Sequence, residues 1–474
     1  MPLPIGESIG GKPICRVLSE NSDVARAKRG QRTCLTRRRK CHISGVSTRC
    51  VCAAALLFAA LIYGGVLPRT HKRRFASLLP PHAITGVSGK ALSAPTKTRS
   101  GAYRLALELR SVSGKLGAFA AGSEARGRIT VFIPAALYEA PLPGRLYSRN
   151  RSAQTPVVDS GVSLAFAGKM SAANTANGTA DMPVFFADSA EYAETGRLAF
   201  GERLARFRAA CRLEFKRVLY AWGDAGGLFL ALAAGTTEYV DPDVSDAFRK
   251  AGLAHVLALS GMHLSVFSGF TRRLTKRGGR AVSGCASFLF ITLFVWFAGF
   301  SPSLRRAFIG FALAAAARFC GKRIDARAGL AACFVLHALL APEDVFALSF
   351  ILSYGGLAGI FVFGEALRLP LCRLRFSPGA AGISASAGAA LGTAPISAFC
   401  WGCVAPSGFV ASAAVSPLVS LFLIAGAVCV ALSLAAPFLL FPLGAIMRLM
   451  YRAIICVTGA FAQIPQVFIV GLPL

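Results

Sequence analysis

Charged residues are scarce in this sequence, and acidic residues are the scarcest of them. Only 16% of the 474 residues are charged, whereas 54% are hydrophobic and the mean hydropathy is +0.56. A soluble domain needs a polar exterior, so this composition excludes an ordinary soluble protein. Long stretches after Ala281 hold no charge at all. A bilayer imposes such unevenness, because a charge buried in it is costly.

Histidine is also rare, and neither His nor Cys occurs at the spacing of a zinc site. The fourteen cysteines are scattered, and several lie in apolar runs where Cys acts as a small hydrophobic residue. Cys400 and Cys403 form a C-x-x-C pair, but a redox pair is typical of a soluble βαβ context. We therefore expect no metal and no cofactor.

Basic residues are plentiful, with 52 Lys and Arg against 22 acids and a net charge of +30. This excess fits either nucleic-acid binding or the basic cytoplasmic loops of a membrane protein. Residues 1–50 hold eleven basic residues against three acids. This polar, arginine-rich composition predicts a disordered cytoplasmic tail. The stretch is far longer than the basic region of a cleavable signal, so we do not expect a signal peptide here.

Two segments of different composition follow the tail. Residues 51–67 are apolar and about long enough for one transmembrane anchor. Residues 68–224 are rich in Gly, Ser, Thr and Pro, and strict alternation predicts half-buried strands at 103–110, 127–133 and 162–166. We expect a small β-rich domain outside the cytoplasmic membrane, with a barrel as one candidate form.

This domain ends in a basic amphipathic helix, predicted over residues 197–222. Apolar residues such as Phe207, Phe215 and Trp222 recur at helical spacing, and Arg and Lys occupy most other positions. A helix of this kind is typical of a membrane surface, although it could also bind phosphates.

Hydrophobic runs dominate residues 225–474 and predict an α-helical polytopic membrane protein with about 8 to 10 transmembrane helices in all. The run at 226–234 is short enough to be interfacial. The basic residues just before the first span place residues 1–50 in the cytoplasm, and in the bundle basic loops alternate with neutral or acidic ones. The basic loops are 271–280, 321–327 and 367–376, and the others are 341–344 and 401–408.

Arg305 and Arg306 break this alternation, because they lie at a helix end that should face outside. Charged residues at the edge of a membrane helix are expensive and are retained mainly for function. The pair is therefore a candidate functional site.

Residues 248–263 place two histidines and a serine within an apolar run. On a continuous helix His255 and His263 would lie about 80° apart, with Ser260 about 140° from His255, so that they form one polar arc. Such groups either face a cavity or join helices by hydrogen bonds. The pattern leaves both interpretations open.

The stretch 252–263, G-L-A-H-V-L-A-L-S-G-M-H, resembles the signature of the ComEC-type competence proteins, which are inner-membrane channels for transforming DNA. The family form is approximately G-L-A-H-L-L-A-I-S-G-L-H. Further segments resemble family motifs in the family's order, and the resemblance covers about residues 203–420. These segments are 301–307, 320–325, 346–350, 393–395 and 416–418.

The resemblance implies transport of single-stranded DNA into the cytoplasm, with a DNA-binding domain of OB type in the place of residues 68–224. A DNA path through a membrane needs cations, polar groups and water, because every nucleotide carries a phosphate. The expected partners are single-stranded DNA, the lipid bilayer, other DNA-uptake proteins, a separate nuclease and a second copy in a homodimer. The path candidates are Arg249, His255, Ser260, His263, Arg305, Arg306, Ser349 and Ser353.

The sequence also departs from the family. Thr236 and Thr237 replace a frequent Asp-Arg, Ala347 replaces a glutamine and Ser412 replaces an asparagine, so polar groups are missing from the supposed path. Many members carry a metallo-β-lactamase-like nuclease domain with an H-x-H-x-D-H motif. The six histidines here are too far apart for that motif, so we expect a transport protein and no enzyme activity.

Two other functions compete with DNA uptake. Ser260 with two nearby histidines is the minimal nucleophile–base arrangement of an intramembrane serine hydrolase, which requires a base within about 3 Å of the hydroxyl. An unrelated solute permease or membrane scaffold is the other alternative. A permease predicts inverted repeats, and we find none that is convincing.

Overall fold

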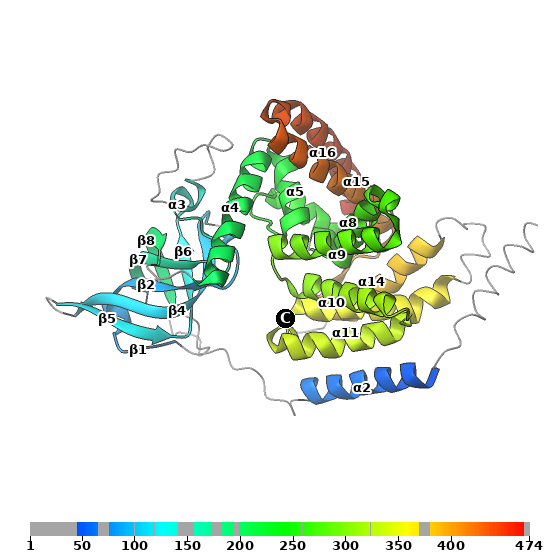
Figure 1. Ribbon diagram of the computed structural model, residues 1–474, viewed down its shortest axis with the longest axis horizontal. Coiled ribbons are helices and arrows are strands. Elements are labelled where there is room, and N and C mark those ends of the chain that lie inside the picture. The colour runs from blue at the N-terminus through cyan, green and yellow to red at the C-terminus, as the bar shows by residue number, and fades with distance from the viewer. Residues whose placement is uncertain are drawn as a thin grey trace, which may run out of the picture.

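The computed structural model describes residues 45–64, 75–98, 100–116, 119–140, 156–171, 183–193, 199–257, 259–322, 324–368 and 380–468. A β-barrel domain lies beside a helical bundle, and helix α4 (Phe200–Tyr220) stands between them (Figure 1). Most of the predicted basic tail, residues 1–44, lies outside the described residues. Helix α2 (Gly45–Tyr63) contains most of the expected anchor but begins six residues before residue 51.

The β-domain is a closed barrel with additional edge strands. β4, β2, β7, β8 and β6 pair in that order, and β6 pairs again with β4 to close the ring. Every pair is antiparallel except β6 with β8. The eight strands are β1 (Ala76–Ser77), β2 (Ile84–Ala91), β3 (Thr96–Lys97), β4 (Tyr103–Leu116), β5 (Phe119–Arg126), β6 (Arg128–Ile133), β7 (Ser163–Ser171) and β8 (Val184–Tyr192).

The alternation in the sequence accounts for the barrel interior. In β6, the side chains of Ile129, Val131 and Ile133 are fully buried while their neighbours face outward, as period-two strands require. Tyr103 and Leu105 fill the interior from β4 in the same way. The three predicted strands are therefore confirmed, and the second half of β4 extends beyond the prediction to pair with β5.

The N-terminal part of α4 is fastened to the barrel. Glu202 accepts hydrogen bonds from the Ser163 backbone N–H at 3.0 Å and from its hydroxyl at 2.9 Å. Burial by itself would raise the pKa of Glu202, but these bonds and Arg206 hold it below its ordinary value. Arg212 is buried and pairs with Asp159 at 3.1 Å. Several cations of this basic helix thus serve the barrel contact.

The C-terminal part of α4 meets the bundle through a second buried polar group. Lys216 Nζ lies 3.7 Å from Glu238, which follows helix α5, and donates to the Tyr138 hydroxyl at 2.6 Å. That hydroxyl donates to Glu238 at 3.1 Å. Loss of water raises the pKa of Glu238 and lowers the pKa of Lys216, because burial disfavours both charges. The barrel, α4 and the bundle are joined at this point.

The bundle is a set of apolar helices, five of which among the described residues are long and apolar enough to cross a membrane. The prediction of about 8 to 10 spans therefore stays a prediction. The expected interfacial run at 226–234 forms α5, whose residues are buried in the bundle core. The helices are α5 (Asp224–Ala234), α6 (Pro242–Lys250), α7 (Ala254–Leu257), α8 (Gly261–Leu274), α9 (Gly279–Ala298), α10 (Pro302–Phe319), α11 (Ala326–Leu340), α12 (Leu348–Gly359), α14 (Ala380–Trp401), α15 (Gly408–Ala435) and α16 (Leu440–Ala462).

Glycines allow α12 and α14 to pack with their backbones in contact. A Cβ built on Gly359 would lie 2.3 Å from the Gly388 carbonyl oxygen and 2.7 Å from the Gly392 Cα. Neither distance is compatible with a side chain, so close packing depends on glycine at these positions. Small residues at helix crossings are typical of membrane bundles, where packing replaces the hydrophobic effect.

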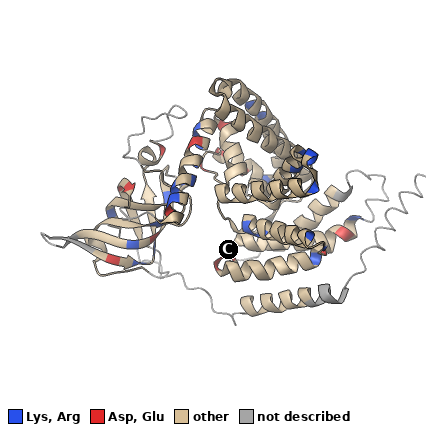
Figure 2. Cartoon of the chain, in the orientation of Figure 1, with Lys and Arg blue, Asp and Glu red and all other residues tan. Residues whose placement is uncertain are grey.

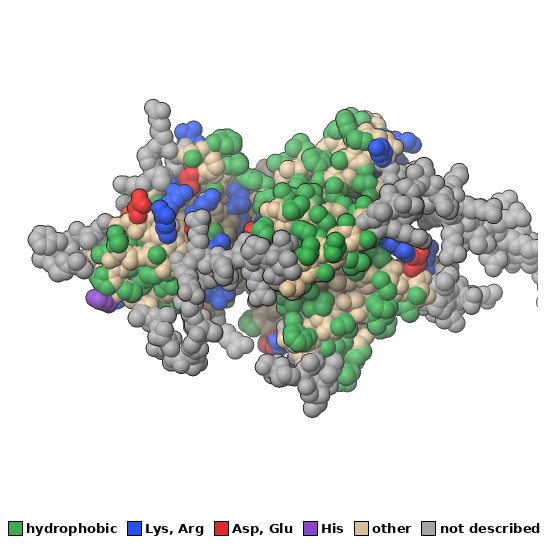
Figure 3. All heavy atoms as spheres, turned by 90° about the horizontal axis from the view of Figure 1, so that it is seen from below, with side chains coloured by type: hydrophobic (Ala, Val, Ile, Leu, Met, Phe, Trp, Pro, Cys, Tyr) green, Lys and Arg blue, Asp and Glu red, His purple; other side chains and the backbone are tan. Residues whose placement is uncertain are grey.

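The distribution of charge fits a bundle that lies in a membrane. Lys and Arg lie along α4 and mainly near helix ends in the bundle (Figure 2). Seen from below, the bundle surface is largely covered by hydrophobic side chains (Figure 3). Leu289 and Leu293 of α9 and Phe441 of α16 are more than half exposed. Such a continuous apolar surface is explained by contact with lipid.

Candidate functional site

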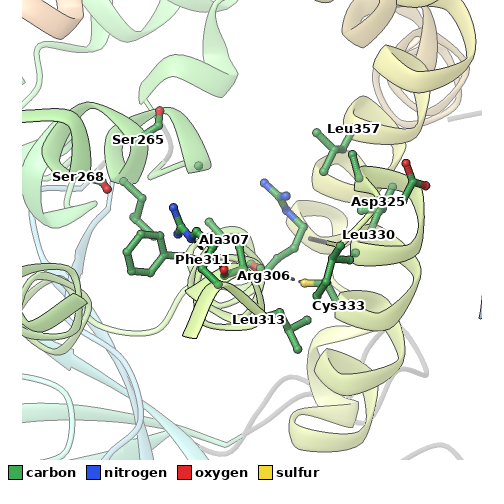
Figure 4. Close-up of a pocket in the computed structure, with 18 of the residues that line it drawn as sticks. Ser265, Ser268, Arg306, Ala307, Phe311, Leu313, Asp325, Leu330, Cys333 and Leu357 are labelled. Carbon is green, nitrogen blue, oxygen red and sulfur yellow. Dashed lines mark hydrogen bonds between the residues drawn. The ribbon is translucent and has the colours of Figure 1, made fainter. Parts of the chain in front are cut away.

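A cavity of about 620 Å³ lies between α8, α10, α11 and α12. Arg306 lines it near the start of α10 (Figure 4). Arg318 lines it three turns later on the same helix. Twelve residues of helix separate them, so the cavity follows α10 for roughly 18 Å. Ser265, Ser268 and Arg272 line it from α8. Cations thus occur towards both ends of the cavity, with hydroxyl groups between them, and Asp325 adds one acidic side chain to the lining.

Arg306 is held in place by two neighbouring helices, α11 and α12. Its Nε donates to Ser353 Oγ of α12 at 2.6 Å, and its guanidinium lies 5.9 Å from the centre of the Tyr354 ring. The Cys333 thiol of α11 donates to its backbone carbonyl at 3.3 Å. No acidic side chain pairs with Arg306 among the described residues. The guanidinium therefore keeps its positive charge available to an anion in the cavity.

Arg272 supplies a second such group. Its Nε is buried and has no hydrogen-bond partner within the described part of the chain. An unsatisfied buried donor on a cation is costly unless an anion or water completes it. The cavity therefore offers two guanidinium groups suited to phosphate.

Arg305 has a different role from Arg306, although the sequence pairs them. Its Nη1 lies 2.9 Å from Asp344 and 3.7 Å from Glu343, so its charge is matched locally. Asp344, ionised beside Arg305, also accepts from His337 Nε2 at 3.1 Å, and His337 Nδ1 lies 3.3 Å from the Tyr354 hydroxyl. This network supports the aromatic ring beside Arg306.

The predicted polar arc does not form, because the helix over residues 252–270 is not continuous. Gly252 adopts a positive φ of 73° before the single turn of α7, and α8 begins only at Gly261. A Cβ on Gly252 would lie 2.8 Å from the Cα of Gly408, so the backbone of α15 approaches closely there. The angles expected for one helix therefore do not apply.

The break instead brings Ser260 against His263. The Ser260 backbone N–H donates to His263 Nδ1 at 3.1 Å. Ser260 is the N-cap of α8 and His263 is the third residue of the helix, so the two form a capping box. The Ser260 hydroxyl is also 3.1 Å from this nitrogen. The distance required of a serine nucleophile and its base is met, but the same nitrogen already serves the helix cap.

The structure separates the other predicted path residues from the cavity. Arg249 is exposed on α6 and pairs with Asp246 at 3.0 Å, and His255 is exposed on α7. Ser349 is exposed at the start of α12, where its backbone carbonyl accepts from Ser303. None of the three lines the cavity. Of the eight candidates, Arg306 lines the cavity, and Ser353 contacts it through the hydrogen bond from Arg306 Nε.

Several residues of the site were missed at the sequence level. His337 is fully buried within a helix that is otherwise apolar, and a histidine in such a run was a usable signal. Ser265 and Ser268 also lie on one face of a helix at a spacing of three residues. Tyr354 and Cys333 gave no signal, because both are ordinary in an apolar helix.

Comparisons with known proteins now bear on this arrangement. A family model described as Competence protein matches residues 232–473, which are just over half of the chain. The chain belongs to the competence protein family. The matched region contains all four helices that surround the cavity. The resemblance in the signature and the later motifs is thereby confirmed.

One curated protein is similar to part of this chain. ComE operon protein 3 of Bacillus subtilis strain 168 is 28% identical over 133 residues. The aligned part is 28% of this chain and 17% of that relative. No solved structure matches the chain significantly.

The departures from the competence family lie elsewhere than the cavity. Thr236 is buried and Thr237 exposed after α5, Ala347 precedes α12, and Ser412 lies in the first turns of α15. None of these four residues lines the cavity. The polar groups lost at these positions therefore do not reduce the number of cations at the site.

Proposed function

We propose that this chain carries single-stranded DNA across the inner membrane into the cytoplasm through the cavity between α8, α10, α11 and α12. The observation that supports this most is Arg306, an unpaired cation fixed over a cavity in an apolar bundle. Charge in a membrane interior is kept for a substrate or ion path. Membership in the competence protein family supports DNA as that substrate.

The order of the charges gives the path a direction. Arg272 and Arg318 border the loops at 271–280 and 321–327, which the positive-inside rule assigns to the cytoplasm. Gly261 and Arg306 then lie at the outer end, because α8 and α10 both begin there. A phosphate would meet Arg306 first and the two cytoplasmic arginines last. Successive weak sites of this kind allow passage without trapping.

The barrel has the role of a DNA receptor in this proposal. Its five closed strands, with one parallel pair between β6 and β8, fit the OB type of small Greek-key barrel, which binds oligonucleotides. We place it on the outer side of the membrane. Other uptake proteins, a separate nuclease and a homodimer are further expectations of the proposal.

The test is uptake of labelled DNA by a transformable host in which the native gene is deleted and the chain is supplied in trans. Deletion should abolish uptake, and the wild-type chain should restore it. Arg306→Gln should lower uptake by at least about tenfold, since it removes a charge-assisted contact worth about 1.5–3 kcal/mol. Arg306→Lys should retain part of the activity.

Arg249→Gln provides the matched control. Arg249 is an exposed arginine in an i,i+3 pair, and such pairs contribute only about 0–1 kcal/mol to stability. This variant should take up DNA as the wild type does. Normal uptake in the deletion strain, or in Arg306→Gln at equal membrane levels, would refute the proposed path.

A further inference from the structure

Four strands of the barrel align a cation, two aromatic rings and a second cation in one row. Lys169 of β7 is the register partner of Phe186 of β8, which is the partner of Phe132 of β6. Phe132 is in turn the partner of Arg104 of β4. Register partners point to the same face of a sheet. The row therefore runs across the barrel as Lys169, Phe186, Phe132 and Arg104.

The row faces outward. Lys169 and Arg104 are exposed, Phe186 is 51% exposed and Phe132 is half-buried. Their neighbours along the strands, Phe185 and Val131, are fully buried in the barrel instead. The centres of the two phenyl rings lie 5.5 Å apart with an angle of 21° between their planes, so the rings are stacked on each other with an offset.

Neither flanking cation has an ion-pair partner among the described residues. A pair of exposed phenylalanines is unusual on a barrel, because aromatic side chains usually occupy the interior. The barrel core is already complete without these two rings, since its interior positions are occupied by buried residues. The row is thus not required to fill the domain.

We infer that the row from Lys169 to Arg104 binds single-stranded DNA, with a base stacked on the ring pair of Phe132 and Phe186 and a phosphate contact at each side. This inference rests on the proposed function and locates its DNA-binding surface. Every base has a flat face, so stacking on Phe132 and Phe186 selects no sequence. Paired bases of a duplex are stacked on each other and cannot use the rings.

Charge complementarity decides for nucleic acid over an apolar partner. A hydrophobic peptide would use the rings but gain nothing from the two cations beside them, whereas a DNA strand uses both. Asp188, which follows Phe186 by two residues on β8, is exposed and is the acidic neighbour of the row on that strand. Its negative charge repels phosphate and so lowers the affinity of the row for DNA, and a neutral substitution should remove this repulsion.

The experiment measures binding of a fluorescent oligo(dT) of about 12 nucleotides to the full-length chain in nanodiscs of neutral lipid, by anisotropy. An abasic oligomer of equal length, which has the phosphates but no bases, is the second probe. The wild type should bind oligo(dT) more tightly than the abasic strand. Phe132→Leu and Phe186→Leu, which keep apolar side chains, should each weaken oligo(dT) binding about fivefold or more.

The two probes separate stacking from charge. The Phe variants should bind the abasic strand as the wild type does, so that the difference between probes shrinks. Lys169→Gln and Arg104→Gln should weaken both probes, and each should reduce the slope of log K against log salt by about 0.7. Asp188→Asn should tighten both. Lys90→Gln is the control, because Lys90 is exposed on β2, which pairs with neither β6 nor β8.

Wild-type oligo(dT) affinity in both Phe variants would overturn the inference, as would a wild type that binds no single strand. DNA uptake distinguishes this failure from failure of the proposed function. If the chain restores DNA uptake but the Phe variants bind oligo(dT) normally, the proposed channel stands and the stacking site is refuted. If the chain binds oligo(dT) through the row but restores no DNA uptake, the stacking site stands and the proposed channel is refuted.

Discussion

His337 Nε2 lies 3.1 Å from Asp344 Oδ2, and Arg305 Nη1 lies 2.9 Å from the same oxygen. One carboxylate thus joins a buried histidine of α11 to an arginine of α10. His337 in turn contacts Tyr354, whose ring lies beside Arg306. The group links the charge-matched arginine to the one that lines the cavity, and its integrity should matter to the whole crossing of α10, α11 and α12.

Asp344→Ala should destabilise the bundle strongly. Removing one partner of a fully buried charged pair typically costs about 3–5 kcal/mol. Arg305 is 24% exposed and keeps Glu343 nearby, so we expect a part of that cost. Glu343→Ala is the matched control, since Glu343 is 59% exposed and 3.7 Å from the same arginine. We expect a large fall in the thermal midpoint of the purified protein for the first variant and little change for the second. Equal midpoints would show that the network carries no stability.

Gly261→Ala should impair DNA uptake without loss of stability. Its new Cβ would lie 3.3 Å from Arg306 Nη2, so the guanidinium must shift by a few tenths of an ångström at the cavity. Alanine favours a helix over glycine by about 0.5–1 kcal/mol, so the fold should not suffer. Uptake in the deletion strain, compared at equal membrane levels, measures the effect.

Gly269→Ala is the control for this variant. Gly269 lines the same cavity on the same helix, but a Cβ there meets no atom within 4 Å. Its uptake should match the wild type. If both variants were equally impaired, added volume in the cavity rather than displacement of Arg306 would be the cause.

Glu202→Gln should weaken the attachment of α4 to the barrel in a pH-dependent manner. The pKa of Glu202 is depressed in the folded protein, so its contribution to stability is present above the unfolded pKa of about 4.3. That contribution is lost as the pH falls through the lower folded value. The thermal midpoint should therefore drop at pH 7 in the variant, and the difference from wild type should shrink in acid. The same substitution at exposed Glu191 should show neither effect.

Ser260 should not react with a fluorophosphonate probe. Within the described part of the chain, the base in reach of Ser260 is His263 Nδ1, which already accepts the Ser260 backbone N–H. His263 is fully buried, and its Nε2 has no partner among the described residues that could orient it as a base. Labelling of the purified protein, followed by gel fluorescence, checks this. A signal that disappears in Ser260→Ala would revive the hydrolase.

Local pattern was sufficient for much of the fold. Strict alternation identified the strands β4, β6 and β7 because period two is set by the strand itself. The spacing of Phe207 to Trp222 identified α4 for the equivalent reason in a helix. The apolar runs identified the bundle, because a bilayer excludes charge over a whole segment.

The same reasoning misjudged the signature segment. Apolar content alone predicts a helix through residues 252–270, but Gly252 permits a left-handed turn and the backbone of Gly408 lies against it. Nothing local announces that contact, because the two glycines are far apart in the sequence. The polar arc was therefore wrong, while the neighbourhood of Ser260 and His263 was right.

What the sequence determined by itself was the membrane bundle, the β-rich domain before it, the family signature and the interest of Arg306. These follow from composition, periodicity and short motifs, which are properties of neighbouring residues. The tertiary structure decided that Arg306 lines a cavity while Arg305 is neutralised by Asp344, and that four strands align Lys169, Phe186, Phe132 and Arg104. Charge partners and register are set by residues distant in the chain, and no local pattern encodes which of two adjacent arginines keeps its charge free.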